Sequence, residues 1–270
     1  MPVVRWNRIL ITGAAGRLGS QLRTGLRDAA NVRRLTDVRE LAPATAGEEV
    51  VIADLQDFTA VQQLMVGVDL VLHFGAVMVK EAWSKVLPVN IIGTYNVFEA
   101  ARLAGVRRIV YASSSHAVGM YGCNELLDAN SPPRPDTPYG LSKAFGENLA
   151  RMYFDKYEIE AACLRIGSCF EEATDERMLA TWLSHKDLVQ LCRRCIDAPV
   201  LGYAVAYGMS DNPRRWWDNR QVDYLGYRPE DGAEVFMETI MAHASQPAPF
   251  DPATLFQGGQ YVLVPDRDAR

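Results

Sequence analysis

Short, largely apolar runs alternate with stretches of helical periodicity from the N-terminus to about Gly167. RILIT (residues 8–12) and VDLVLHFGAV (residues 68–77) have the composition of parallel strands that are buried on both faces. The same pattern predicts strands at 32–37, 49–55, 108–115 and 159–167, and helices at 16–30, 57–66, 83–104 and from 138 onward. Strands that alternate with helices predict an α/β fold, a doubly wound parallel sheet of the Rossmann type.

The pattern becomes less regular after Gly167, where one short strand is predicted at 203–208 between helical segments. This part is too short to form a second domain with a sheet of its own. We therefore interpret residues 1–270 as a single Rossmann-type domain, with a cofactor-binding core at about 1–167 and a small cap on the substrate side at about 168–270.

Three glycines follow the first predicted strand in ITGAAGRLGS, at the point where a helix begins. Gly13, Gly16 and Gly19 have the spacing G-x-x-G-x-x-G, which allows a tight turn and a close approach of the backbone to a pyrophosphate. The alternative is a glycine-rich turn without a ligand, but three glycines lose much conformational entropy on folding. The segment predicts a dinucleotide site.

An acidic residue ends the second predicted strand. Asp37 follows the glycine turn at the end of this strand, and a carboxylate there binds the adenosine ribose hydroxyls and repels a 2′-phosphate. It favours NAD over NADP, although Arg39 is a rival that would accommodate the phosphate. Asp54 and Leu55, after the third strand, are candidates for flanking the adenine ring, but they also suit an ordinary strand end.

Composition narrows the class of protein further. The net charge of −5 argues against a nucleic-acid surface, and no apolar run approaches the length of a membrane span. The N-terminus has no signal-peptide pattern, and five scattered cysteines suit a reducing compartment, so we expect a cytoplasmic protein. Cys192 and Cys195 form a C-x-x-C without a second ligand pair, and no metal site is expected.

Tyr139 and Lys143 lie one helical turn apart in PYGLSK, at the start of a predicted helix. They would share one helix face, where an ammonium group favours the phenolate form of the tyrosine and makes it a usable general base. A solvated lysine beside a half-buried tyrosine on an amphipathic helix is the alternative. A hydroxyl from Ser113, Ser114 or Ser115, at the end of the fifth strand, could face the tyrosine.

Together GAAGRLG, NIIGTYN, YASSS and YGLSK resemble the extended short-chain dehydrogenase/reductase family over the segment 1–167. The resemblance implies that Tyr139 is the catalytic acid/base, that Lys143 lowers its pKa and holds the nicotinamide ribose, and that Ser114 orients the substrate. It also implies NAD contacts at Gly13, Gly16, Arg17, Leu18, Gly19, Asp37, Asp54, Leu55, Phe74, Gly75, Ala76, Asn90, Ser113, Tyr139, Lys143 and Ile166. His73, on an apolar strand, is expected to be structural.

FGENLARMYFDK, LRIGSC, RMLATWLS and WWDN are similar to the uronate dehydrogenases, a compact branch of this family. That resemblance implies oxidation of glucuronate or galacturonate at the anomeric carbon, to an aldarolactone and NADH. Arg177 matches the arginine that binds the carboxylate, and Ser168 and His116 match further substrate contacts. Two positions depart from the branch, since Ser115 replaces an asparagine and Met78 replaces a serine.

Three other functions remain open from the sequence. The two departures would suit a dehydrogenase of a neutral or phosphorylated aldose with the same mechanism. A nucleotide-sugar epimerase or dehydratase is disfavoured by the short C-terminal part, and a non-catalytic dinucleotide sensor has no need of the Tyr139–Lys143 pair. The expected partners are NAD and a small sugar acid, with no nucleic acid and no membrane, and a homo-oligomer is possible.

Overall fold

A computed structural model describes residues 6–243 and 250–265 of the chain. Within these ranges, seven strands form one parallel sheet in the order β3-β2-β1-β4-β5-β6-β9. The strands are β1 (Trp6–Thr12), β2 (Ala30–Asp37), β3 (Glu48–Ile52), β4 (Leu70–His73), β5 (Arg108–Ser114), β6 (Glu160–Ile166) and β9 (Tyr203–Gly208). The strand order reverses between β1 and β4, and folds of this kind bind ligands outside the carboxyl ends of the strands at that point.

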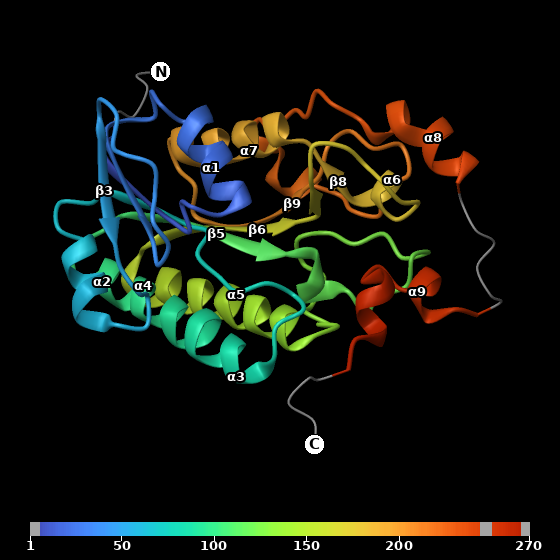
Figure 1. The fold of residues 1–270 in the computed structure, drawn as a ribbon, viewed down its shortest axis with the longest axis horizontal. Coiled ribbons are helices and arrows are strands. Elements are labelled where there is room, and N and C mark those ends of the chain that lie inside the picture. The colour runs from blue at the N-terminus through green and yellow to red at the C-terminus, as the bar shows by residue number, and fades with distance from the viewer. Residues whose placement is uncertain (1–5, 244–249, 266–270) are drawn as a thin grey trace.

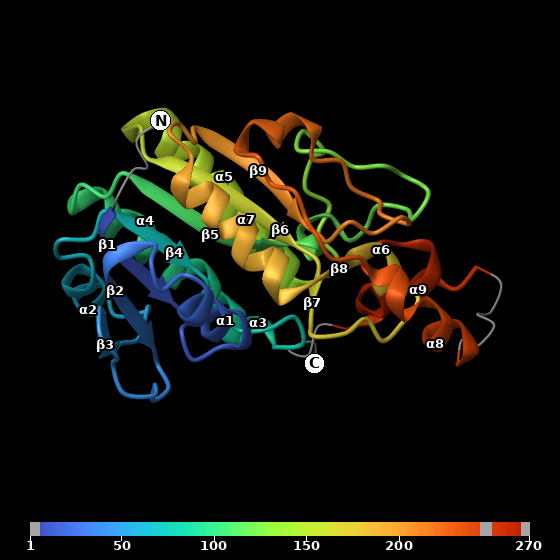
Figure 2. The same cartoon turned by 90° about the horizontal axis from the view of Figure 1, so that it is seen from above.

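Helices cover both faces of this sheet. The main ones are α1 (Arg17–Gly25), α2 (Phe58–Leu64), α4 (Gly93–Leu103), α5 (Pro138–Tyr157) and α7 (His185–Asp197). Helices α1 and α7 lie on one face, and α2, α4 and α5 lie on the other (Figures 1 and 2). Alternate residues of β1 pack into two separate cores, Ile9 and Ile11 beneath the first pair of helices and Leu10 beneath the other three. The predicted doubly wound α/β fold is confirmed.

Local sequence explains where the functional helix α5 begins and ends. Thr137 is its N-cap, and its hydroxyl accepts a hydrogen bond from the Gly140 amide at 3.0 Å. Pro138 occupies the first turn, where its missing N–H costs nothing. The helix ends at Tyr157, and its C-cap Glu158 has a left-handed backbone with φ 58°. These signals fix the register that carries Tyr139.

The predicted element boundaries need several corrections. The strand at 203–208 is β9, which pairs with β6, so the sheet extends past Gly167 instead of ending there. Several predicted segments are shorter, because α1 ends at Gly25, β3 ends at Ile52 and β4 spans only Leu70–His73. The predicted helix at 83–104 is three helical segments in succession, α3 (Trp83–Val86), the π-helix η1 (Leu87–Ile92) and α4. Pro88 lies in the π-helical segment and cannot donate a regular helical hydrogen bond.

Most of the remaining segments lie at the carboxyl end of the sheet (Figure 2). The remaining segments are the short helices η2 (Ser115–Val118), α6 (Met178–Thr181), η3 (Arg220–Leu225), η4 (Ala233–Phe236), α8 (Met237–Ala242), α9 (Pro252–Leu255) and η5 (Gly259–Leu263), and the strands β7 (Ser168–Cys169) and β8 (Trp182–Leu183). The chain after α9 returns to the segment that follows β5, where the Gln257 and Gly258 amides each donate to a carbonyl of that segment, Tyr121 and Gly119, at 2.8 Å. Among the described residues, no helix combines the length and apolar character needed to cross a membrane.

Candidate active site

In the glycine turn between β1 and α1, neighbouring backbone atoms lie so close to Gly13 and Gly19 that a side chain at either position would collide with them. Gly13 has φ +69°, and a Cβ there would lie 2.7 Å from backbone atoms of Phe74 and Gly75. A Cβ on Gly19 would collide with the Gly13 carbonyl, and the Gly16 amide donates to that same carbonyl at 2.9 Å. The turn therefore brings the backbone and the N-terminus of α1 together as the dinucleotide prediction requires.

Asp37 lies at the end of β2 beside this turn. Its carboxylate accepts hydrogen bonds from the backbone amides of Ala15 and Arg39, each at 3.0 Å. The Arg39 guanidinium is 3.4 Å away, but 63% of that side chain is exposed. A carboxylate retains further lone pairs beyond these two bonds, so Asp37 is able to accept hydrogen bonds from ribose hydroxyl groups.

The other predicted cofactor residues are distributed around the same end of the sheet. Phe74, Gly75 and Ala76 follow β4 and are partly buried. The Asp54 carboxylate accepts from the Gln56 amide at 2.9 Å, whereas Leu55 is 7% exposed and packs near Gly75. Three more predicted residues are Arg17, with its guanidinium 3.9 Å from the Phe170 ring centroid, Leu18, which packs on the core, and Ile166, which ends β6.

Thr12 and His73 link β1 to the loop that follows β4. The Thr12 hydroxyl accepts from the amides of Phe74 and Gly75 and lies 2.8 Å from His73 Nδ1, to which it must therefore donate. His73 Nε2 then carries the ring hydrogen and donates to Thr94 at 3.1 Å. Burial lowers the pKa of His73 to about 3. The histidine is neutral and holds the loop, as the sequence analysis expected.

Tyr139 and Lys143 lie on α5 and face the end of β5. The Ser114 hydroxyl hydrogen-bonds the Tyr139 hydroxyl, and Lys143 Nζ lies 5.4 Å from the Tyr139 ring centroid. Burial raises the pKa of Tyr139 to about 12, the hydrogen bond from Ser114 opposes this rise, and the Asp136 charge adds to it. Burial lowers the pKa of Lys143 to about 7, while its amine donates to the Ala112 carbonyl at 2.7 Å.

One expectation about this pair is wrong for the protein by itself. The one-turn spacing predicts that Lys143 lowers the pKa of Tyr139, yet that pKa is raised, because desolvation of the phenolate dominates. Of the three serines considered, Ser114 is the one that reaches the tyrosine. Ser113 instead donates to Glu147 at 2.6 Å. Both serines therefore contact α5, Ser113 through Glu147 and Ser114 through Tyr139.

Asn90 is buried in the π-helix η1, with all of its polar atoms engaged. Its Oδ1 accepts from the Val77 amide at 2.8 Å, and its Nδ2 donates to the Val77 carbonyl at 3.2 Å and to the Ser142 hydroxyl at 3.1 Å. These bonds join the loop after β4 to α5. The Asn90 side chain thus bonds to the Val77 backbone and to Ser142, and the NAD contact expected for it stays a prediction.

Arg177 is a partly buried residue whose guanidinium group has an incomplete set of hydrogen bonds. Its Nη1 donates to the Ser168 hydroxyl at 3.1 Å and its Nε donates to the Gln257 carbonyl at 2.6 Å. Its Nη2 is buried and has no partner among the described residues. Burial lowers the pKa of Arg177, and the charges of Asp175 and Asp136 oppose that shift. An acceptor-only anion such as a carboxylate would satisfy the remaining N–H groups.

The remaining predicted substrate residues differ in their surroundings. His116 lies edge-on to Tyr139, with ring centroids 6.1 Å apart, and its Nδ1 is 2.7 Å from Asp136 Oδ2. Ser115 is buried at the start of η2, next to His116. The Met78 side chain is 65% exposed, in the loop after β4.

Sequence reasoning missed three residues that the fold brings to this site. Asp136 precedes α5 and contacts His116, while Gln257 and Tyr261 arrive from the C-terminal segment. Tyr261 packs edge-on against His116, with ring centroids 4.8 Å apart. The paired glycines 258 and 259 signal a tight turn in this segment, but no local pattern indicates that the turn reaches residues 119–123.

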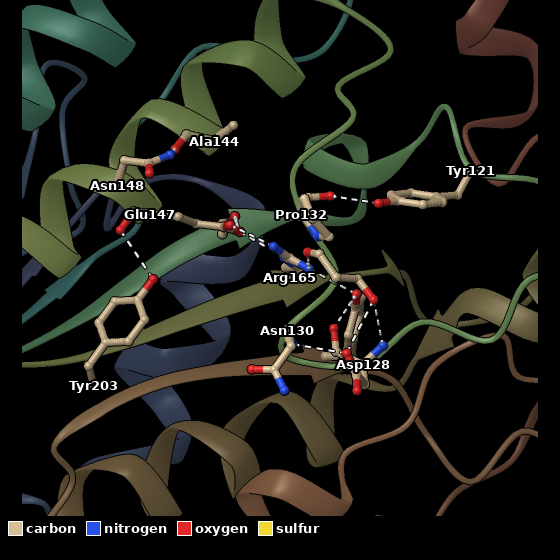
Figure 3. A network of polar contacts seen from close by, with 12 residues as sticks. Tyr121, Asp128, Asn130, Pro132, Ala144, Glu147, Asn148, Arg165 and Tyr203 are labelled. Atoms are coloured by element: carbon tan, nitrogen blue, oxygen red, sulfur yellow. Dashed lines mark hydrogen bonds and ion pairs between the residues drawn. The ribbon is translucent and has the colours of Figure 1, made fainter.

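A buried network anchors α5 to the sheet beneath the site (Figure 3). Glu147, one helical turn after Lys143, forms an ion pair with Arg165 of β6 at 2.9 Å, and only 4% and 2% of the two side chains are exposed. Arg165 also donates to the Tyr207 hydroxyl of β9 at 2.9 Å and to the Ser131 carbonyl at 3.1 Å. The network connects the helix that carries Tyr139 to two strands and to the loop before it.

Comparison with known proteins gives this geometry a context. The model of the NAD dependent epimerase/dehydratase family matches residues 9–196. The uronate dehydrogenase of Pseudomonas syringae pv. tomato is 48% identical over 258 residues, which cover 95% of this chain and 94% of that protein. The uronate dehydrogenase of Pseudomonas putida is 47% identical over 265 residues, which cover 98% of both chains.

The fold agrees with that of a solved relative. A mutant of the uronate dehydrogenase from Agrobacterium tumefaciens, complexed with NAD, superposes with a TM-score of 0.92 at 46% identity. The match covers 96% of this chain and 98% of that one. The similarity therefore extends past Gly167 into the C-terminal part of the chain.

Proposed function

The chain belongs to the NAD dependent epimerase/dehydratase family and to its uronate dehydrogenases, and we propose that it oxidises the anomeric carbon of glucuronate or galacturonate to an aldarolactone. It is an NAD-dependent oxidoreductase that acts on a uronate. The choice of carbon, the product and the roles of individual residues are the proposal.

The observation that carries the proposal is the buried Nη2 nitrogen of the Arg177 guanidinium group. This nitrogen has no partner among the described residues, Arg177 lies on the same side of the fold as Tyr139, and the charge of Asp136 acts on both residues. A carboxylate accepts two parallel hydrogen bonds from a guanidinium, which fixes both its position and its orientation. Ser168, already bonded to Arg177, adds a hydroxyl at this position.

The residues around the glycine turn fit a dinucleotide. The turn excludes Cβ atoms at Gly13 and Gly19, which leaves backbone N–H groups free to approach a pyrophosphate, and Asp37 offers acceptors to a ribose. When bound, NAD supplies the acceptor for the hydride that leaves the anomeric carbon. We assign Gly13, Gly16, Gly19, Asp37 and the residues after β4 to holding it.

In the proposed mechanism, Tyr139 removes the proton of the anomeric hydroxyl group and Ser114 hydrogen-bonds the same oxygen. The carbon–oxygen double bond of the lactone forms as the hydride leaves that carbon. A pKa of about 12 makes phenolate scarce in the protein by itself. Tyr139 therefore depends on positive charge close to its oxygen, and the protonated form of Lys143 is one source.

Arg177 also supports a second candidate, a dehydrogenase of a phosphorylated aldose, because a guanidinium fork binds phosphate as well as carboxylate. The exposed Met78 and the short Ser115 leave the opposite end of the sugar less constrained. A neutral aldose is disfavoured, because its hydroxyl groups offer no negative charge to pair with the Arg177 guanidinium.

The test is NADH formation by purified protein with glucuronate, galacturonate, glucose, galactose and glucose 6-phosphate. We expect the uronates to react, Tyr139→Phe to lower kcat by about a thousandfold or more, and Arg177→Met to raise the KM for the uronate about 10- to 100-fold. Arg177→Lys keeps the positive charge but loses the two parallel hydrogen bonds of the guanidinium group, so it separates the contribution of charge from that of hydrogen-bond geometry. If glucose 6-phosphate reacts while the uronates do not, the substrate assignment is wrong.

We further propose that the enzyme works in the cytoplasm and as a homo-oligomer. The five cysteines are all free, which supports a reducing compartment. Exposed apolar side chains on α4 and α5, among them Tyr95, Leu103, Met152 and Tyr157, support association through these two helices.

A further inference from the structure

The carboxyl group of Asp136 is enclosed between three segments of the active site. Its side chain has no exposed surface, its Oδ2 lies 2.7 Å from His116 Nδ1, and its Oδ1 accepts from the Thr137 hydroxyl at 3.0 Å. A Cβ at either Gly119 or Gly258 would collide with this carboxyl group. Gly119 lies in the segment after β5 and Gly258 in the C-terminal segment. The absence of a side chain at both positions provides the space that the Asp136 carboxyl group occupies.

This contact determines which nitrogen of His116 carries the hydrogen. A carboxylate can only accept hydrogen bonds, so the hydrogen of a neutral imidazole lies on Nδ1 and Nε2 keeps its lone pair. Among the described residues, Nε2 has no hydrogen-bond partner, whereas Nδ1 has Asp136. The His116 ring lies edge-on to Tyr139 at an interplanar angle of 73°. A hydrogen-bond acceptor is thus available next to the proposed base.

The position of the His116 ring is constrained on its other sides as well. Tyr261 packs against it at an interplanar angle of 78°. The His116 amide donates to the Ser114 hydroxyl at 3.2 Å, and a Cβ at Gly140 would collide with the His116 carbonyl. The ring therefore has little freedom to rotate, and the Asp136 contact fixes its tautomer in one orientation.

We propose that Asp136 is a positioning residue for the substrate, which acts through His116 by keeping Nε2 as an acceptor for a hydroxyl group of the sugar. The inference rests on the proposed function for the nature of the substrate. A ring hydroxyl donates to Nε2, and an imidazole that carried its hydrogen on Nε2 would lose this bond. Asp136 does not touch the reacting atoms. Its carboxylate sets the hydrogen-bonding character of a group that contacts the sugar.

The tautomer is tested directly on the wild-type protein by ¹⁵N NMR of the histidine side chains, with the His116→Ala variant used to assign the signals. We expect the His116 signals of a bare Nε2 and a protonated Nδ1 at neutral pH. A protonated Nε2 with a bare Nδ1 would overturn the proposal. This measurement needs no turnover, so it tests the Asp136–His116 contact even if the wild-type enzyme proves inactive on uronates, which would overturn the proposed function alone.

The role in binding is tested by a double-mutant cycle with Asp136→Leu and His116→Ala. We expect Asp136→Leu to raise the KM for the uronate about tenfold in the wild-type background, the value of one hydrogen bond, and less than twofold when residue 116 is alanine. An equal factor in both backgrounds, or no change in either, would overturn the proposal. If Asp136→Leu does not fold, as judged by thermal unfolding and NAD binding, Asp136→Asn goes through the same cycle.

Asp175→Asn is the matched control for the loss of charge. The Asp175 charge also acts on Arg177, but its side chain is exposed and accepts from the Met178 amide at 2.8 Å, a bond that asparagine can keep. We expect its KM for the uronate to stay within twofold of wild type. A rise that equals the effect of Asp136→Leu would assign that effect to Arg177 and would overturn the role given to His116.

Discussion

The proposed cofactor side and the proposed substrate side of the molecule are built in different ways. On the cofactor side, the glycine turn, Asp37 and the loop after β4 are close together near the start of the chain, and backbone conformation largely defines the site. On the substrate side, His116, Asp136, Arg177 and Gln257 come from segments that are widely separated in the sequence, and side-chain contacts define the site. Turn geometry is readable from local sequence, whereas contacts between distant segments depend on the completed fold.

Helix α5 contributes residues to both sides. We therefore expect the largest loss of stability when the ion pair that anchors this helix to the sheet is broken. Glu147→Gln leaves the Arg165 charge buried without a full counter-charge, and we expect a loss of about 3–5 kcal/mol in the free energy of unfolding. Urea unfolding measures it. The double variant Glu147→Gln/Arg165→Met, which removes both charges, should lose less than the single variant. If Glu147→Gln were as stable as wild type, the network would not anchor the helix.

The cofactor side should respond strongly to a single methyl group. Gly13→Ala combines a left-handed backbone with a collision against Phe74 and Gly75, so we expect a loss of about 2–3 kcal/mol in the free energy of unfolding and weaker NAD binding. Gly105→Ala is the matched control, because Gly105 has φ +74° but nothing within 4 Å of its Cβ position. It should lose only about 1 kcal/mol. Equal losses would show that the close approach is unimportant.

A change at Asp37 should separate the two sides kinetically. Asp37→Ala removes the acceptors offered to the ribose, and we expect the KM for NAD to rise about tenfold while the KM for the uronate stays unchanged. Loss of the negative charge should also improve the use of NADP, whose 2′-phosphate the Asp37 carboxylate would repel. Initial rates with each dinucleotide measure both effects. An unchanged preference for NAD over NADP would contradict the role given to Asp37.

The features that the sequence predicted correctly are local patterns, whereas those it did not predict depend on contacts between distant segments. The alternation of strands and helices, the glycine turn and the Tyr139–Lys143 spacing are local patterns, and the structure contains all three. The prediction that the sheet ends at about Gly167 was wrong. Whether the strand at 203–208 joins the sheet depends on the strand with which it pairs, and β9 pairs with β6. Strand pairing of this kind is a long-range property that residues 203–208 do not specify alone.

Burial explains the two chemical features that the sequence did not reveal. The spacing of Tyr139 and Lys143 predicted a lowered tyrosine pKa from charge proximity, but desolvation raises it. Asp136 stands just before a predicted helix with nothing local to mark it, yet it is fully buried against His116. Neither degree of burial can be inferred from residue type, because both depend on the segments that close over them, one of which begins at Gln257.

The smallest predicted effect is a pH dependence of stability that originates at the junction of the two sides. Burial lowers the pKa of Lys143 to about 7, against 10.5 for an ordinary lysine. Between these values the unfolded chain binds a proton that the folded protein has released, so raising the pH favours folding. We expect Lys143 to add about 1 kcal/mol to the free energy of unfolding between pH 7 and pH 8.

The measurement is urea unfolding of the wild type and of Lys143→Met at both pH values, because the difference between the two proteins removes the contribution of every other titrating group. Methionine has a similar length and no charge, so that variant should lack this rise with pH, and it should also lack activity. Parallel pH profiles for the two proteins would mean that Lys143 keeps its proton in the fold. A Lys143 that stays protonated in the folded protein would stabilise the phenolate form of Tyr139 by its positive charge, as the spacing of the two residues predicts.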